Sequence, residues 1–207
     1  MHARNLIPCI VLLNALCSAQ TPTWAPIQPT TSPGGRISPG MAYDSARNRV
    51  VLFGGHGGNS GGGYLSDTWE LDGKNWTQIK PTTSPPYRYS HAMTYDAARQ
   101  RVVLFGGYTH LVPFDLSDTW EWDGKNWTQA KPTTSPSARY SHAMAYDSRG
   151  RTVLFGGYLH STGYLGDTWE YGLGRVTASA TPYGATCGPT LAPATNSRPI
   201  IGTKFRA

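Results

Sequence analysis

Histidine and tyrosine recur at matching places in three loop-like stretches of this chain, where they could bind a ligand. Two stretches carry Tyr-x-His, and two carry a tyrosine directly before a leucine. Aromatic and imidazole rings on a loop suit stacking on a sugar or gripping a peptide. The candidate ligand-binding residues of these stretches are His56, Tyr64, Tyr108, His110, Tyr158, His160 and Tyr164.

Arginine is the other residue type that could meet a ligand at the same end of the strands. Arg88 and Arg139, with Arg36 as their earlier counterpart, each come shortly before a predicted first strand. They could contact an acidic ligand, or they could pair with Asp or Glu of the following repeat. We favour the pairing and keep Arg88 and Arg139 as ligand candidates.

Metal binding and catalysis find little support. A metal site needs three or four ligands converging about 2 Å from the ion. His56, His110 and His160 lie in separate repeats and would rarely meet so closely, so we expect no metal and no cofactor. No serine nucleophile motif occurs, and we expect no catalytic residue. The glutamates share one repeat position and so do not read as an acid and base pair: Glu70, Glu121 and Glu170.

These residues lie within a repeat of about 50 residues, a period typical of propeller blades. In each copy a methionine and a Tyr-Asp pair precede a glycine pair, and an Asp-Thr-Trp triplet follows. The first two copies carry a further tryptophan. We expect the recurrent glycines and tryptophans to be structural: Gly54, Gly55, Trp69, Trp76, Gly106, Gly107, Trp120, Trp127, Gly156, Gly157 and Trp169.

The complete middle copy, residues 88–132, predicts four strands. Its near-continuous apolar run RVVLFGG suits a second strand covered on both faces. The glycine pair at its end lets the chain bend and another segment approach closely. In the third strand, SDTWEWD, we expect Asp118 to hold local backbone amides. An Asp-Gly turn then leads to the outer strand NWTQAKP.

The glycine pairs and the spaced aromatic residues resemble the kelch repeat family over residues 24–171. The resemblance implies an all-β fold of kelch-type β-propeller blades, with the loops between second and third strands at one mouth of the ring. It says little about function, because one fold hosts many functions. Galactose-oxidase-like proteins share this propeller and use copper with a modified cysteine, but the repeats here contain no cysteine.

The predicted strands make about three four-stranded blades, a partial or fragmentary propeller. Residues 23–33, TWAPIQPTTSP, align with the outer strand of the next copy, whereas the third copy lacks one. An early strand could complete the last blade and close a ring; alternatively, residues 175–180 complete it. Because propellers have about 4 to 8 blades, we expect a fragment of a longer propeller. A homodimer completing a ring is the second interpretation, and an open arc is a further alternative.

The two ends differ from the propeller segment at residues 20–175. Residues 1–19 combine an early arginine with a short apolar run and a small residue, Ala19, which predicts a cleaved signal peptide and a secreted or extracytoplasmic protein. The run is too short to span a bilayer, and a lipid anchor on Cys17 is the weaker alternative. Residues 176–207 form a Thr/Pro/Gly-rich tail or the start of a truncated β module resembling one of exported bacterial proteins. Cys187 in this tail would be an unpaired thiol.

Composition agrees with an all-β protein, because 24 Gly, 16 Pro, 12 Tyr and 7 Trp suit short strands and tight turns. The formal charge of +6 comes partly from arginines repeated once per copy, so we expect no nucleic-acid partner. The leading hypothesis is an exported, non-catalytic scaffold that binds an extracellular protein or glycan through its loops. The alternative is the propeller part of an extracellular oxidase or glycosidase whose catalytic part lies elsewhere.

Overall fold

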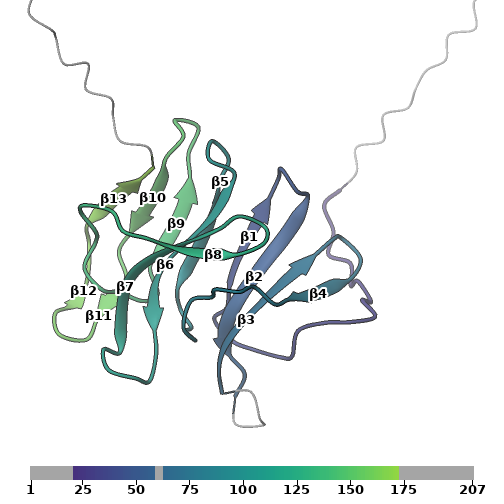
Figure 1. Ribbon diagram of the computed structural model, residues 1–207, viewed down its shortest axis with the longest axis horizontal. Helices are drawn as coiled ribbons and strands as arrows, with labels where there is room; N and C mark the ends of the chain where they lie inside the picture. Colours follow the sequence, from purple (N-terminus) through teal and green to yellow (C-terminus); the bar gives the residue numbers. More distant parts are fainter. Residues whose placement is uncertain (1–20, 59–62, 173–207) are drawn as a thin grey trace, which may run out of the picture. The chain divides into compact units, whose positions relative to one another are not determined.

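The computed structural model describes residues 21–58 and 63–172, and these are built from β-strands (Figure 1). They belong to a compact unit that ends at Gly172. The predicted signal peptide, the predicted tail with Cys187, and the alternative strand at 175–180 lie outside the described residues. Within the described ranges, no helix is long and apolar enough to cross a membrane.

Three antiparallel sheets of three or four strands follow one another along the chain, and a small two-stranded sheet accompanies the third (Figure 1). The first contains, in spatial order, β1 (Gly40–Asp44), β2 (Arg49–His56), β3 (Tyr64–Leu71) and β4 (Trp76–Ile79). The second repeats this order with β5 (Ala92–Asp96), β6 (Arg101–Tyr108), β7 (Asp115–Trp122) and β8 (Trp127–Ala130). The third has the order β13 (Thr168–Tyr171), β10 (Thr152–Phe155) and β9 (Ala143–Tyr146), and β11 (Tyr158–Leu159) pairs with β12 (Gly163–Tyr164).

The sheets confirm the predicted all-β blades, two of four strands and one of three. The outer strand predicted at residues 23–33, expected to complete the last blade, is wrong for the single chain: the segment forms no strand, and β13 pairs only with β10 among the described residues. The segment instead reaches the start of β4: the Thr30 amide donates to Asn75 Oδ1 at 2.9 Å, and the Thr31 hydroxyl donates to the Trp76 carbonyl. The equivalent linker at residues 81–85 binds Asn126 and Trp127 of the second sheet in the same way.

Successive sheets pack face against face, with β5 lying between β1 and β9. Because side chains alternate along a strand, each sheet has a forward face, directed at the next sheet, and a rear face. On the forward face of the first sheet, the Phe53 ring lies 5.2 Å from the Trp127 ring in an edge-on arrangement. The Trp127 indole also donates to Thr68 Oγ1 at 3.0 Å. A rear-face tryptophan of the second sheet therefore joins it to the first.

The main core cluster occupies this first junction. Trp122 and Trp127 are fully buried in it, whereas Trp120 packs against it while partly exposed. The Trp122 indole donates to Glu70 Oε1 at 3.0 Å across the junction. The buried members of the core cluster are Val51, Phe53, Met93, Tyr95, Val102, Leu104, Trp122 and Trp127.

In β2 and β6 a glycine pair lies at a β-bulge one residue before the strand ends, where the next repeat crosses the strand. Gly106 has φ +60°, and a Cβ there would lie 2.6 Å from the Arg139 carbonyl oxygen. The neighbouring Gly107 amide donates to that same carbonyl at 2.9 Å. The pair thus supplies the left-handed backbone and the free space that let two sheets share a hydrogen bond.

We predict that Gly106→Ala lowers the free energy of unfolding by about 3 kcal/mol or more, because left-handed strain adds to overlap with a neighbouring carbonyl. The matched control is Gly163→Ala, where φ is +88° but nothing lies within 4 Å of the added Cβ. Strain alone should cost about 1 kcal/mol there. Urea unfolding measures both values, and equal losses would contradict the close approach.

Two buried histidines precede the first strands of the second and third sheets. His91 Nε2 accepts a hydrogen bond from the Gly40 amide at 3.1 Å, and the His142 ring packs edge-on against Phe105 at 5.5 Å. Burial, with the charge of Arg88 nearby, lowers the pKa of His91 to about 3. Burial and the charge of Arg139 lower the pKa of His142 to about 4. Both imidazoles are therefore neutral in the folded chain at pH 5 to 7.

The unfolded chain binds protons at these histidines as pH falls through about 6.5, whereas the folded chain does not, so stability should fall on acidification. Between pH 7 and 5 each histidine should cost roughly 2 kcal/mol of unfolding free energy. Urea unfolding at the two pH values measures the loss, and the double variant His91→Gln/His142→Gln should lose less than the wild type. An unchanged pH dependence in that variant would contradict the assignment.

Candidate functional site

Aromatic and imidazole rings gather where second strands end and third strands begin. In each repeat the residue after the buried arginine forms an isolated bridge with the end of a second strand or its continuation: Ile37 with His56, Tyr89 with Tyr108, and Tyr140 with Tyr158. The connection between β6 and β7 and the β11–β12 turn add further rings. We call this set the aromatic rim: His56, Tyr64, Tyr87, Tyr89, Tyr108, His110, Phe114, Tyr140, Tyr158, His160 and Tyr164.

The first half of the aromatic rim centres on Tyr64. Its ring lies 4.5 Å from His110, 4.9 Å from His56 and 5.6 Å from Tyr89. Tyr87 stacks on His110 at 5.1 Å with nearly parallel rings. Residues from the first two repeats thus form one group of contacting rings.

The second half centres on Tyr108 and His160. The His160 ring lies 5.3 Å from both Tyr108 and Tyr140, and 5.7 Å from Tyr158. Tyr158 contacts Tyr164 at 5.3 Å, and Tyr164 is 91% exposed. Tyr89 and Tyr108, 5.3 Å apart, connect the two halves. The aromatic rim is therefore one continuous network across three repeats.

One acidic residue orients an imidazole within this network. His160 Nδ1 lies 2.7 Å from Asp115 Oδ1, and the His160 amide donates to Asp115 Oδ2 at 2.9 Å. Asp115 is nearly buried at the start of β7, whereas the His160 side chain is half exposed. The pair holds the turn of the third repeat against the second sheet.

The phenols at the centre of the rim stay protonated at neutral pH. Burial, reinforced by the neighbouring tyrosines, raises the pKa of Tyr89 above its ordinary value. Burial, with Tyr158 and Asp115 nearby, does the same for the pKa of Tyr140. These hydroxyls can thus donate as well as accept hydrogen bonds.

The structure brings together seven of the nine ligand candidates and separates the two arginines from them. Arg88 and Arg139 are fully buried and bonded within the fold. Arg88 donates to both carboxylate oxygens of Asp118 at 2.6 and 2.8 Å and to the Gly106 carbonyl at 3.0 Å. Arg139 binds Asp167 and the Gly156 carbonyl alike.

This pairing corrects one expectation. The acidic partner belongs to the same repeat, not the following one, because the arginine backbone binds the preceding repeat while its side chain reaches the third strand of its own sheet. Asp118 also accepts from the Trp120 indole, besides the bond with its own backbone amide. Burial alone would raise the pKa of Asp118, but its bonds with Arg88 outweigh this and hold the pKa below its usual range.

Sequence reasoning missed Tyr89 and Tyr140, which directly follow the two arginines. Consecutive residues of an extended segment point to opposite sides, so a buried arginine places the next side chain outward. The repeated Arg-Tyr dipeptide was the available signal. Asp115 carried no such signal, because neither neighbouring repeat has an acidic residue at that place.

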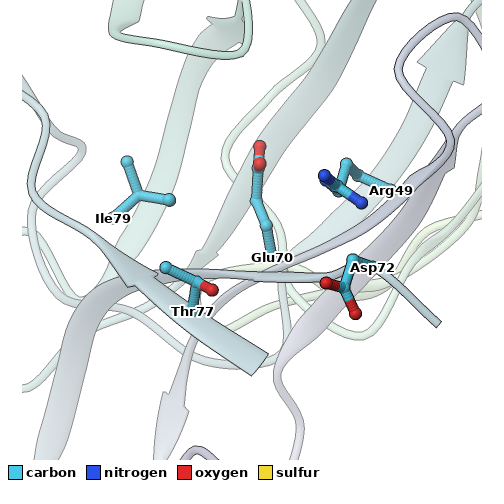
Figure 2. Close-up of a pocket in the computed structure, with 5 residues that line it drawn as sticks. All are labelled: Arg49, Glu70, Asp72, Thr77 and Ile79. Atoms are coloured by element: carbon cyan, nitrogen blue, oxygen red, sulfur yellow. The ribbon is translucent and has the colours of Figure 1, made fainter. Parts of the chain in front are cut away.

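Two hollows away from the rim are lined by repeat positions. Figure 2 shows one of about 200 Å³ on the forward face of the first sheet, lined by Arg49, Glu70, Asp72, Thr77 and Ile79. Glu70 there already accepts hydrogen bonds from Arg47 and Trp122. A more open one of about 480 Å³ lies between the first strands of the three sheets and includes Tyr43, Met93 and Tyr146.

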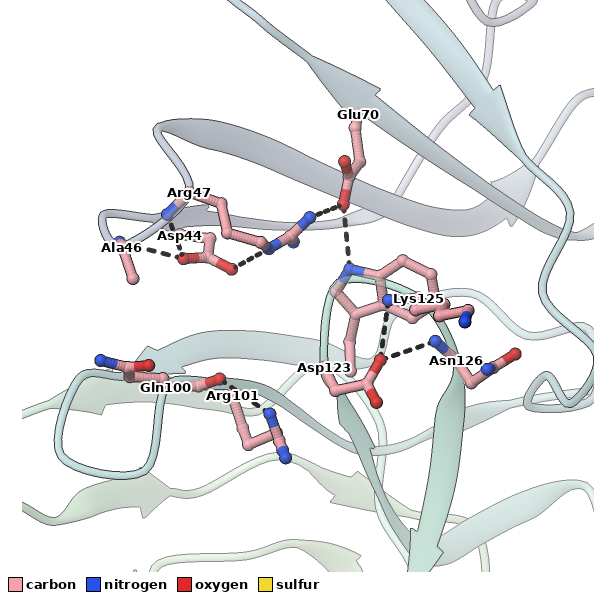
Figure 3. Close-up of polar contacts among 10 residues, drawn as sticks. Asp44, Ala46, Arg47, Glu70, Gln100, Arg101, Asp123, Lys125 and Asn126 are labelled. Carbon is pink, nitrogen blue, oxygen red and sulfur yellow. Dashed lines mark hydrogen bonds and ion pairs between the residues drawn. The ribbon is translucent and has the colours of Figure 1, made fainter.

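The glutamates serve the first hairpin of each repeat. Figure 3 shows Arg47 between Asp44 and Glu70, with ion pairs of 2.8 and 2.6 Å, and Arg99 and Arg149 repeat the arrangement. These contacts give the repeated glutamates a structural role. Within residues 21–58 and 63–172, no group of three His, Cys, Asp or Glu side chains could hold a metal ion.

Comparison with known proteins gives the repeats a family context. A family model described as "KLHDC2/KLHL20/DRC7 Kelch-repeats domain" matches residues 12–182. The chain is 33% identical over 127 residues to dynein regulatory complex subunit 7 of Chlamydomonas reinhardtii, covering 59% of this chain and 11% of that protein.

Two further relatives show the same partial coverage. Identity to Adagio protein 3 of Arabidopsis thaliana is 28% over 156 residues, or 71% of this chain and 24% of the relative. Identity to the flagellar outer arm dynein alpha chain of Chlamydomonas reinhardtii is 27% over 144 residues, or 66% of this chain and 3% of the relative. The chain therefore spans no more than a quarter of these three relatives.

We predict that Arg88→Leu lowers the free energy of unfolding by about 3 kcal/mol, because Asp118 would keep a largely buried charge without its partner. The double variant Arg88→Leu/Asp118→Leu should recover part of this loss, since no unpaired charge remains. Arg149→Leu is the control: its side chain is 61% exposed, and its loss should change stability little. Chemical denaturation distinguishes these outcomes, and equal effects of Arg88→Leu and Arg149→Leu would contradict the buried pairing.

Proposed function

The chain belongs to the Kelch-repeat family, and from that premise we propose that it is a non-catalytic interaction scaffold whose aromatic rim binds a protein or a glycan outside the cytoplasm. The observation that carries the proposal is the continuity of the rim, in which rings from three repeats contact one another at one end of the sheets. A partner could contact several of these rings at once.

The contrast between strands and loops supports this proposal. The second strands repeat nearly identical residues, RVVLFGG in two copies, whereas the loops that follow differ in length and composition. A rigid scaffold with variable loop tips is a common arrangement for recognition. Tyrosine is well suited to such a surface, because it adds a large contact area and a hydroxyl at small entropic cost.

The Asp115–His160 pair favours a second candidate, the propeller part of an extracellular enzyme. A carboxylate that orients an imidazole is the arrangement that general bases use. The sequence contains no serine nucleophile motif, so in this second candidate the catalytic part lies elsewhere. Turnover of an oligosaccharide that disappears in Asp115→Asn would favour this candidate over the scaffold.

Export rests on residues 1–19, whose charged start, apolar run and small Ala19 have the order of a signal peptide. The mature protein should begin at Gln20. Mass spectrometry of the protein recovered from the medium or periplasm tests this. An intact amino terminus on a cytoplasmic protein would remove the extracytoplasmic part of the proposal.

We predict saturable binding of the full-length chain to at least one member of a glycan array or a displayed peptide library. The double variant His110→Ala/Tyr164→Ala removes one exposed ring from each half of the rim and should weaken that binding by at least about tenfold, a loss of 1.4 kcal/mol. Lys125→Ala, an exposed change at the β7–β8 turn outside the rim, should leave it unchanged.

The outcome separates the ligand classes as well. Binding on the glycan array alone identifies a sugar, and binding to peptides alone identifies a protein. Binding that survives His110→Ala/Tyr164→Ala, or that falls equally in Lys125→Ala, would contradict the rim as the binding surface.

A further inference from the structure

The forward face of the third sheet exposes residues that are buried in the other two sheets. Phe155 is 56% exposed, whereas its counterparts Phe53 and Phe105 are 0% and 3% exposed. Thr168, paired with Phe155 across β10 and β13, is exposed too, although Thr68 and Thr119 are buried. Among the described residues, no sheet therefore packs on the forward face of the third sheet.

The rear face of the first sheet shows the complementary exposure. Met41 and Tyr43 are 50% and 53% exposed, whereas Met93 and Tyr95 of the second sheet are 8% and 9% exposed. Trp76, the counterpart of the buried Trp127, is partly exposed, and its indole nitrogen has no hydrogen-bond partner among the described residues. The chain therefore carries both halves of one more sheet–sheet junction.

The two open faces match the chemistry of the existing junctions. At the first junction a phenylalanine and a threonine of one sheet receive a tryptophan of the next through ring packing and an indole hydrogen bond. Phe155 and Thr168 could receive Trp76 of a second copy of the chain in the same way. The fit is between unlike faces, which makes the contact head to tail.

Backbone contacts between repeats also stop at these two faces. The Ser90 amide donates to the Ser38 carbonyl at 3.0 Å, and the Ser141 amide donates to the Ser90 carbonyl at 2.8 Å. All three serines hold the same positive φ, 49° to 56°, which non-glycine residues adopt rarely. Within the described residues, the Ser38 amide and the Ser141 carbonyl have no such partner. Each end of this series of serine-to-serine hydrogen bonds could therefore form one more bond of the same kind.

The segment before the first sheet has the sequence that the third sheet lacks. Within the described residues β13 pairs only with β10, which leaves its other edge open. Residues 24–33, WAPIQPTTSP, resemble the outer strand and linker WTQIKPTTSP at 76–85, and Trp24 is fully exposed. Thr30 and Thr31 already bind the first sheet as Thr82 and Thr83 bind the second. Trp24–Ile27 therefore stand where an outer strand of a preceding sheet would lie.

We propose that two copies of this chain join head to tail, the third sheet of each against the first sheet of the other, in a closed homodimer. In each junction Trp24–Ile27 of one copy add an outer strand to β13 of the other. This pairing would bury both open faces and give the backbone groups at the open edge of β13 hydrogen-bond partners. It would also continue the serine-to-serine hydrogen bonds from one molecule to the other. It requires no feature of the aromatic rim.

Analytical ultracentrifugation of the full chain tests the assembly. We expect twice the mass of one chain at micromolar concentration. A monomer at 100 micromolar would overturn the proposal, and an open series of larger species would overturn the closed dimer.

Matched variants test the junction. Phe155→Asp should raise the dissociation constant of the dimer by at least about 30-fold, because a charge enters the centre of the interface. Leu111→Asp, which changes an equally exposed side chain on the β6–β7 connection, should leave the dimer intact. Circular dichroism should show folded β-structure in both. A dimer that persists in folded Phe155→Asp would contradict the assigned face.

Mixing two variants tests the head-to-tail geometry. Phe155→Asp blocks the third sheet, and Tyr43→Asp blocks the first, so each chain alone should be monomeric. Together they retain one intact junction and should form a heterodimer that contains one copy of each. Absence of this heterodimer between two folded variants would contradict a contact between unlike faces.

Discussion

The structure depends on a buried arginine in each repeat that ties the start of a sheet to its third strand. Arg36, Arg88 and Arg139 each bind a carboxylate and the carbonyl of the first glycine of the pair. The same carboxylates accept from the indoles of Trp69, Trp120 and Trp169. These ion pairs matter for stability because they are buried: removing one partner would leave an uncompensated buried charge and lower the free energy of unfolding.

This pairing also positions the surface on which function is proposed. Because Arg88 and Arg139 point inward, Tyr89 and Tyr140 point toward the ends of the second strands, where the rings of the loops meet them. The glycine pairs leave room for the crossing segment, so neighbouring repeats share backbone hydrogen bonds at the base of the rim. Recurrent residues thus hold rings from different repeats in contact, and the loop tips differ without disturbing them.

Repetition made most of the fold predictable and hid part of the site. The glycine pairs and the apolar second strands predicted the blades, because burial on both faces leaves a direct mark on composition. The segment at residues 23–33 was misjudged because similarity to an outer strand does not reveal which sheet the segment can reach: Thr30 and Thr31 bind the first sheet, while the edge of β13 stays open among the described residues. The pairing of Arg88 with Asp118 depends on which sheet the arginine side chain turns toward, because the Arg88 backbone binds the preceding repeat. The Asp115–His160 contact joins two repeats and has no repeated counterpart.

Amide hydrogen exchange at Gly55 and Gly107 tests most directly whether repeats are joined through their glycine pairs. These amides donate to the carbonyls of Arg88 and Arg139 in the next repeat, both at 2.9 Å. The account predicts that they exchange only through global unfolding, as slowly as the amides of the core residues Val51 and Val103. Fast exchange at the glycines beside protected core strands would contradict it, because the sheets would then move independently.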